Sequence, residues 1–239
     1  MKLPSFLKSL LNRLGLFYAE MLCRREYYSQ TFRNVNERPV EYQFVFRQLT
    51  KKLPETVLDV GTGVTALPSL MRSCGFVVTA IDNIKDYWPS GMINRHYYVI
   101  NDDIINPRLD RKFDFITCVS VLEHIKDHSR AVKSMFSLLN PGGHMILTFP
   151  YNETGYVENV YNLPASGVKE KLPFITQAFS RKELDQWMAE NKGTVLEQEY
   201  WQFFTGDYWT CGEMITPPVE VDKNQRHHIS CVLIQKNKG

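Results

Sequence analysis

The sequence lacks the features that mark several specialised classes of protein. No apolar run approaches the ~18 residues of a membrane-spanning helix, and Lys8 and Arg13 interrupt the N-terminal stretch where a secretory signal would be continuous. There is no run of five like charges, no internal repeat and no low-complexity tract. We therefore expect a soluble, cytoplasmic protein without a broad nucleic-acid-binding surface.

Cysteine is scarce and scattered. The five cysteines are Cys23, Cys74, Cys118, Cys211 and Cys231. Their odd number and the absence of a C-x-x-C pair argue against a disulfide framework and against a zinc site. We expect reduced thiols and no metal.

The composition is that of an ordinary globular protein. The chain has 239 residues, 44% hydrophobic and 23% charged, with a net charge of +2. At a typical ~150 residues per domain, this length fits one large domain or one domain with appendages. The nearly balanced charge favours a small, neutral-to-polar substrate.

The first 52 residues are expected to form an N-terminal helical extension ahead of a domain over residues 53–239. An amphipathic helix is predicted from Met1 to about Glu26, and a second helix from Pro39 to Leu49. The apolar stripe of the first helix comprises Leu3, Phe6, Leu7, Leu10, Leu11, Leu14 and Phe17, with Lys2, Lys8 and Arg13 off it. We favour packing of this stripe on the body or on another subunit, as in a homodimer, over peripheral membrane contact.

Short apolar strands alternate with helical patterns from Thr56 onward. The expected strands are Thr56–Val60, Phe76–Ile81, Tyr97–Ile100, Phe113–Val119, His144–Phe149, Val195–Phe203 and Ile229–Gln235, and helices are expected over Leu67–Cys74, Ser129–Leu139 and from a capping box at Ser180. This alternation indicates an α/β fold with helices on both faces of a largely parallel sheet.

A glycine turn follows the first strand. Gly61 and Gly63 allow a tight turn whose N–H groups, with a helix behind them, favour an anionic ligand. The pattern Gly-x-Gly-x-x-Ala fits NAD and S-adenosylmethionine equally. Asp59 favours the second, because its carboxylate would oppose a pyrophosphate but attract a ligand ammonium group. Asp82, after the next strand, can accept both ribose hydroxyls of either cofactor.

Acidic residues also follow the third strand. Asp103 can accept a hydrogen bond from an adenine amino group while Ile84 or Ile104 packs on the ring. The alternative is that these acids cap a turn.

The order of these motifs resembles that of class I S-adenosylmethionine-dependent methyltransferases of the small-molecule type. The residues that carry the resemblance are Leu58-Asp59-Val60-Gly61-Thr62-Gly63, Ile81-Asp82, Asp103-Ile104, the stretch from Phe113 to Ile125 with Glu123-His124, and Asn140-Pro141-Gly142-Gly143. The resemblance implies a Rossmann-like, seven-stranded, doubly wound sheet whose last strand is antiparallel beside the fifth. It also implies S-adenosyl-L-methionine as cofactor, with contacts at Asp59, Gly61, Thr62, Gly63, Asp82, Asn83, Asp103, Ile104 and Ser120.

The sequence departs from parts of this family in informative ways. An Asp/Asn-Pro-Pro-aromatic motif, typical of enzymes that methylate nucleobase amino groups, is replaced by Val119-Ser120-Val121-Leu122-Glu123, so we expect no nucleic-acid substrate. Two inserts, at about 151–176 and 204–228, lie outside the shared core. We expect these inserts to choose the acceptor.

Acceptor and base candidates follow the strand ends. A hydroxyl acceptor must lose its proton, and histidine is the usual base near neutral pH. The candidate bases are His124, His227 and His228, and the candidate acceptor contacts are Tyr151, Asn152, Tyr156, Phe204, Tyr208 and Trp209. Such aromatic and polar groups suit sugars or aromatic natural products, although half of the aromatic residues could equally be core.

The predicted function is therefore methyl transfer to a small-molecule hydroxyl, on a carbohydrate or a secondary metabolite. One alternative is an NAD-dependent oxidoreductase, disfavoured by Asp59 and by the absence of any Tyr-x-x-x-Lys. A second is a cofactor-binding partner subunit without catalytic activity.

Overall fold

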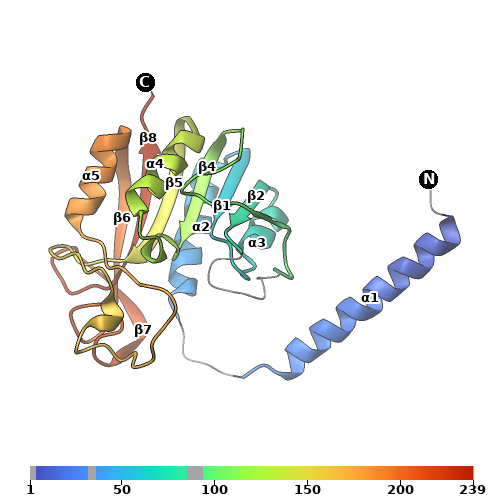
Figure 1. Ribbon diagram of the computed structural model, residues 1–239, viewed down its shortest axis with the longest axis horizontal. Coiled ribbons are helices and arrows are strands. Elements are labelled where there is room, and N and C mark those ends of the chain that lie inside the picture. Colours follow the sequence, from blue (N-terminus) through green and yellow to red (C-terminus); the bar gives the residue numbers. More distant parts are fainter. Residues whose placement is uncertain (1–3, 32–35, 85–93, 239) are drawn as a thin grey trace. The chain divides into compact units, whose positions relative to one another are not determined.

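The chain divides into two units. We describe residues 4–31, 36–84 and 94–238 of a computed structural model. The first unit, Met1–Val35, contains helix α1 (Ser5–Tyr28), and the second unit is Asn36–Gly239 (Figure 1). The predicted start of the first helix, at residues 1–3, lies outside the described residues. Helix α2 (Arg38–Lys52) belongs to the second unit, although the sequence pattern predicted it as part of the N-terminal extension.

The second unit is built on one mixed sheet. After α2 its elements are β1 (Thr56–Val60), α3 (Leu67–Ser73), β2 (Val77–Asp82), β3 (Val99–Asn101), β4 (Phe113–Val119), η1 (Leu122–His124), α4 (His128–Leu138), β5 (Leu139–Pro150), η2 (Val160–Asn162), α5 (Arg181–Asn191), β6 (Gly193–Phe204), β7 (Met214–Val221) and β8 (Ile229–Lys236). The strand order is β3-β2-β1-β4-β5-β8-β6-β7. Strands β1 to β5 pair in parallel, and β8 is antiparallel beside β5, which confirms the predicted doubly wound fold and the reversed last strand.

The sheet has eight strands among the described residues, so the expected count of seven is corrected by one. The additional strand, β7, lies inside the stretch predicted as a loop insert and pairs antiparallel with β6. Pro217 and Pro218 hid it, because proline removes a ladder donor and reads as a strand breaker. At the outer edge of a sheet this loss is tolerated.

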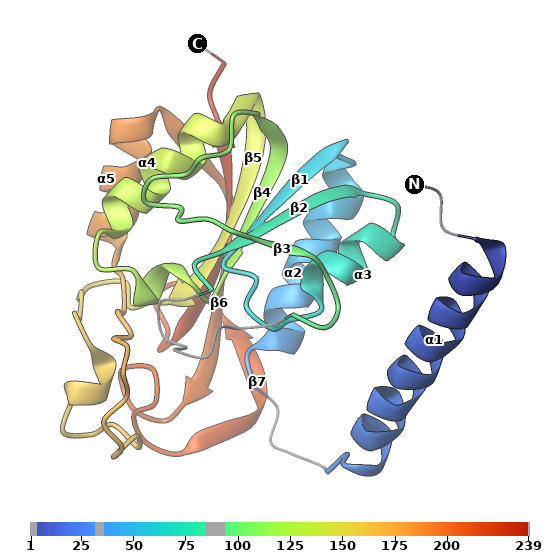
Figure 2. The ribbon, with the colours of Figure 1, turned by 45° about the vertical axis from the view of Figure 1, so that its right-hand side comes forward.

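Two helical layers cover the sheet and bury its two faces separately (Figure 2). One apolar cluster joins α4 and α5 to the sheet through residues such as Met135 and Trp187. The other joins α2 and α3 to the opposite face, with Phe44 and Met71 fully buried. In this arrangement the carboxyl ends of β1, β2, β4 and β5 lie together at one end of the strands, where open α/β sheets bind ligands.

Helix α5 begins as predicted. The side chain of Ser180 accepts a hydrogen bond from the Lys182 N–H, and the Glu183 carboxylate accepts one from the Ser180 N–H at 2.9 Å. This reciprocal capping box fixes where the chain leaves the first insert and re-enters the core.

Candidate functional site

The glycine turn follows β1 and is held against β2. Gly61 and Gly63 have φ angles of +71° and +57°, in the left-handed region that glycine enters without strain. The Gly61 N–H donates to the Ile81 carbonyl at 2.9 Å. A Cβ atom at Gly61 would clash with both methyl groups of Val121, which follows β4. Glycine is thus required here by the packing of the protein itself.

Gly61→Ala is expected to destabilise the protein by at least about 2 kcal/mol, because left-handed strain of ~1–2 kcal/mol adds to the Val121 clash. Adding Val121→Ala should recover the part due to the clash and leave the strain. Thermal unfolding measures both. Gly15→Ala is the control, because a Cβ at Gly15 meets nothing within 4 Å. Wild-type stability of Gly61→Ala would contradict the described turn.

Asp59 lies beneath this turn and is buried. Its carboxylate accepts hydrogen bonds from the hydroxyls of Thr62, at 2.6 Å, and Thr117, at 2.7 Å. Burial raises the pKa of Asp59 to about 6 in spite of these two bonds. As it stands, the carboxylate orients the turn through Thr62.

Asp59→Asn is expected to stabilise the protein at pH 8 by on the order of 3 kcal/mol and to change little near pH 4. The folded-state pKa is raised above the ordinary 3.8, so the folded state holds the proton more tightly and stability falls as pH rises through 4 to 6. Melting temperatures at pH 4 and pH 8 test this. Asp114→Asn is the opposite control, since its hydrogen bonds hold the pKa of Asp114 below its usual value. An equal effect of Asp59→Asn at both pH values would contradict the assignment.

Asp82 ends β2 beside the turn. Its side chain is half-buried, and its Oδ2 accepts a hydrogen bond from the Gly63 N–H at 2.6 Å. The next residue, Asn83, is exposed. A carboxylate anchored at a strand end, directly against a glycine turn, is suited to accept hydrogen bonds from a ribose.

The residues after β3 are partly structural. Asp103 is exposed, and its Oδ1 accepts from the Ile105 N–H at 2.9 Å, the turn capping that the sequence left open as an alternative. Ile104 is 5% exposed and belongs to the core cluster. Asp102 is buried and accepts from the backbone and Nε of Arg108.

A buried carboxylate from α2 braces the ends of β4 and β5. No pattern in the sequence predicted this contact. The Glu41 side chain is fully buried, and its Oε1 accepts from the hydroxyls of Ser120 and Thr148. Its Oε2 accepts from Arg38 Nη1 at 2.7 Å. Ser120 itself adopts a left-handed φ of +49°. This network brings the Arg38 guanidinium to the strand ends.

His124 lies in η1, directly after β4. Its Nδ1 donates to the Ile175 carbonyl at 2.7 Å, and because a carbonyl can only accept, Nε2 is the basic nitrogen of the neutral ring. Burial lowers the pKa of His124, so the ring is neutral near pH 7. Nε2 lies 3.9 Å from Glu123 Oε1, and burial raises the pKa of Glu123 well above its usual value. A neutral imidazole with an unprotonated Nε2 can accept a proton.

The other two candidate bases precede β8 and are buried. His228 Nδ1 accepts from the Phe203 N–H at 3.1 Å, and its Nε2 lies 2.8 Å from the Gly206 carbonyl. Burial lowers the pKa of His228 to about 4. His227 is 4% exposed and stacks on Tyr151. His228 therefore ties the second insert, through Nε2, to the end of β6, through Nδ1.

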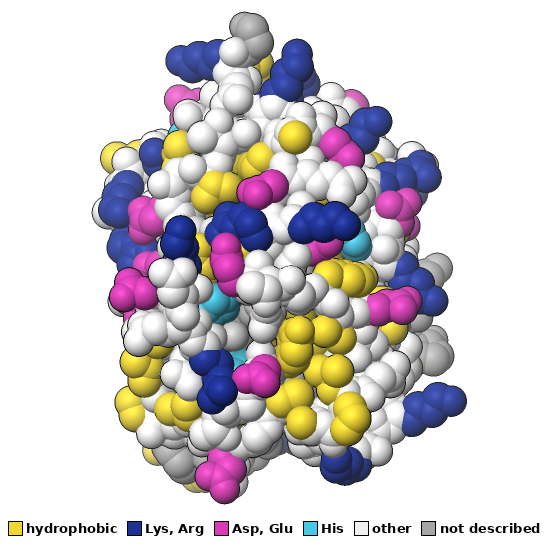
Figure 3. All heavy atoms as spheres, turned by 90° about the vertical axis from the view of Figure 1, so that its left-hand side faces the viewer, with side chains coloured by type: hydrophobic (Ala, Val, Ile, Leu, Met, Phe, Trp, Pro, Cys, Tyr) yellow, Lys and Arg dark blue, Asp and Glu magenta, His cyan; other side chains and the backbone are white. Residues whose placement is uncertain are grey.

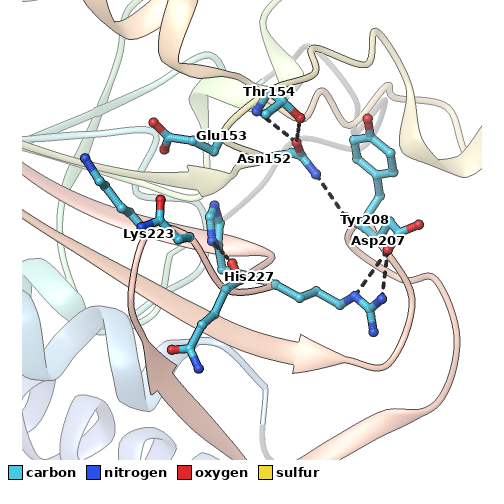
Figure 4. A pocket seen from close by; sticks show the side chains of 10 residues that line it. Asn152, Glu153, Thr154, Asp207, Tyr208, Lys223 and His227 are labelled. Atoms are coloured by element: carbon cyan, nitrogen blue, oxygen red, sulfur yellow. Dashed lines mark hydrogen bonds and ion pairs between the residues drawn. The ribbon is translucent and has the colours of Figure 1, made fainter.

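A cavity of about 540 Å³ lies between the two inserts (Figure 4). Its lining residues are Asn152, Glu153, Thr154, Asp207, Tyr208, Lys223, Asn224, Gln225, Arg226 and His227. It brings together three residues predicted for the site, namely Asn152, Tyr208 and His227. The walls carry amides, hydroxyls and charges of both signs, which suits a polar ligand.

The remaining aromatic candidates divide between rim and core. Tyr156 is 40% exposed and donates its hydroxyl to Gln177 at 2.7 Å. Tyr151 is buried, and the rings of Phe204 and Trp209 pack edge to face at 5.1 Å. The acidic and basic side chains are interspersed over the α5 side of the molecule (Figure 3), so charge singles out no partner there.

The comparison with known families decides between the cofactors that the glycine turn allows. A methyltransferase domain family matches residues 28–208. The chain belongs to this family. It is an S-adenosylmethionine-dependent methyltransferase, which removes the dehydrogenase alternative.

Relatives and solved structures agree with this. The chain is 31% identical over 172 residues to a ubiquinone biosynthesis O-methyltransferase of Coxiella burnetii, covering 66% of this chain and 70% of the relative. It is 28% identical over 193 residues to the enzyme of that name from Pasteurella multocida, covering 72% and 79%.

Two solved structures share the fold. The N-methyltransferase NodS from Bradyrhizobium japonicum, in complex with S-adenosyl-L-homocysteine, has a TM-score of 0.53 at 15% identity and covers 85% of this chain and 88% of its own. The 1,6-didemethyltoxoflavin-N1-methyltransferase from Burkholderia thailandensis has a TM-score of 0.56 at 12% identity and covers 99% and 92%. Among the described residues, no helix has the length and apolar character to cross a bilayer.

Proposed function

We propose that the enzyme transfers a methyl group to a hydroxyl of a small-molecule acceptor. The observation that carries this proposal is His124, a neutral imidazole at the end of β4 whose tautomer leaves Nε2 as the basic nitrogen. An oxygen acceptor needs such a base, whereas a neutral amine can attack without one. The O-methyltransferase names of the relatives support the same choice.

S-adenosylmethionine supplies an electrophilic methyl group when bound. The carboxylate of Asp82, anchored by the Gly63 N–H, fits the ribose of this cofactor. Gly61 and Gly63, with their left-handed φ angles, let the cofactor lie directly against the backbone. We assign Asp82 to the ribose hydroxyls. The turn of Gly61, Thr62 and Gly63, which Asp59 holds in place, is also proposed to contact the cofactor. We assign the adenine to Asn83, Asp103 and Ile104, and a further contact to the backbone of Ser120.

Arg38 adds a positive charge beside these groups. It is paired with Glu41 and affects the pKa values of Asp59 and His124, to which it is electrostatically coupled. A fixed cation at this edge favours an anionic group of the cofactor or acceptor.

The acceptor lies, in this proposal, across the ends of β4 and β5. Its hydroxyl proton passes to His124 Nε2, and the Ile175 carbonyl stabilises the imidazolium that results. Polar groups further along the acceptor reach the cavity and meet Asn152 and Tyr208. A carbohydrate, a hydroxylated secondary metabolite or, following the relatives, an intermediate of ubiquinone biosynthesis has suitable hydroxyls.

The test is incubation of the purified enzyme with isotope-labelled S-adenosylmethionine and panels of phenols, sugars and amines. Mass spectrometry detects the labelled product, and carbon NMR distinguishes an O-methyl from an N-methyl group. We expect label on oxygen. Label on nitrogen or carbon would contradict the proposal, and cofactor binding without any product would favour the non-catalytic partner subunit.

A further inference from the structure

Helix α1 carries an apolar face that its own unit leaves uncovered. None of its 24 residues is buried. Eight large apolar side chains share one face, with exposed fractions of 77% for Phe6, 42% for Leu7, 44% for Leu10, 54% for Leu11, 58% for Leu14, 69% for Phe17, 59% for Tyr18 and 50% for Met21. At 3.6 residues per turn these eight fall within one arc of about 140°, whereas the exposed Leu16 and Tyr27 lie on the opposite face. An apolar surface this continuous marks an interaction site.

The charges around this face are basic. Between Ser5 and Ala19 the only charged residues are Lys8 and Arg13, and the first acid is Glu20. On the helical projection Lys8 and Arg13 lie on opposite margins of the apolar arc. From these margins, long basic side chains can reach past an apolar layer to anionic groups beside it.

We propose that α1 lies in the surface of a lipid bilayer that contains anionic lipids. Its apolar arc enters the boundary of the acyl chains, and Lys8 and Arg13 meet the headgroup phosphates. The helix lies in the plane of the membrane, because it lacks the apolar length to cross it. The inference rests on α1 alone and is independent of the acceptor proposed above.

A second copy of the helix fits this face less well. Leu7, Leu10, Leu14, Phe17 and Met21 follow a heptad seam, but Arg24 falls on the next seam position, so the seam spans about two heptads. A two-stranded coil would leave Phe6, Leu11 and Tyr18 beside the seam in water. A lipid surface covers the seam and these flanking residues together.

Co-sedimentation of the full chain with vesicles tests the proposal. We expect binding to phosphatidylcholine vesicles that contain phosphatidylglycerol, and much weaker binding to phosphatidylcholine alone. Leu11→Gln, beside the seam, and Leu14→Gln, in the seam, should each reduce the bound fraction at least fivefold. Ser9→Gln, on the opposite face, is the matched control and should bind as wild type. Lys8→Gln with Arg13→Gln should remove the preference for anionic vesicles.

Light scattering and thermal unfolding of the same variants test the two other ways of covering this face, by a second copy or by the same chain. If wild type is a dimer and only Leu14→Gln dissociates it, the apolar face of α1 binds a second copy of the chain and not a membrane. A lowered melting temperature in Leu11→Gln and Leu14→Gln, without vesicle binding by wild type, would indicate that α1 packs on its own chain. Failure of wild type to bind anionic vesicles overturns the proposal in either case.

Discussion

Asp82→Ala is expected to weaken S-adenosylmethionine binding at least tenfold. A charge-assisted hydrogen bond contributes roughly 1.5–3 kcal/mol, and the substitution also removes the acceptor of the Gly63 N–H, which holds the turn in place. Isothermal titration calorimetry with S-adenosylmethionine and S-adenosylhomocysteine measures the loss.

Two variants control for charge and for general destabilisation. Asp82→Asn keeps an acceptor oxygen without the charge and should fall between wild type and Asp82→Ala. Asp110→Ala removes an exposed acid just before β4, near the amino ends of the parallel strands. This variant should bind S-adenosylmethionine as tightly as wild type. Unchanged affinity in Asp82→Ala would show that the ribose lies elsewhere.

His124→Ala is expected to reduce kcat by at least 100-fold while the affinity for S-adenosylmethionine stays within threefold, because general base catalysis typically contributes 10²- to 10⁴-fold. His124→Asn distinguishes the role of His124 as a base from its role in holding the first insert, because the asparagine amide can still donate to the Ile175 carbonyl. It should unfold near the wild-type temperature and yet be as inactive as His124→Ala. His96→Ala, an exposed histidine, is the control.

The pH profile gives an independent reading of the same residue. Burial lowers the pKa of His124 below its usual 6.5, so wild-type turnover should be constant from pH 8 to 7 and fall only below that value as the base is protonated. The residual activity of His124→Asn should lack this fall. Turnover in His124→Ala within threefold of wild type would assign the proton to another acceptor.

The sequence predicted those parts of the fold that depend on residues close together along the chain. The glycine turn, the strands before it and after it, and the Ser180 capping box are local patterns with a direct physical cause, and all are present. The position of β8 followed from the resemblance to a family. Strand β7 was missed because its two prolines are tolerated only at an edge, and a single sequence does not reveal which strand is the edge.

The site was less predictable because long-range contacts build it. Glu41 contacts Ser120 and Thr148, which are 79 and 107 residues away in sequence, and nothing near Glu41 signals them. For the same reason Arg38 was not expected at the strand ends. The three histidines were equivalent in sequence, and only their hydrogen-bond partners distinguish His124, between insert and strand, from the buried His228.

A crystal structure with bound S-adenosylhomocysteine would show directly whether the glycine turn and Asp82 hold the cofactor. We predict a ligand across the carboxyl ends of β1, β2 and β4, with its ribose hydroxyls on Asp82 and its sulfur directed toward His124. A ligand seated instead in the cavity between the inserts, or with its ribose away from Asp82, would contradict this prediction.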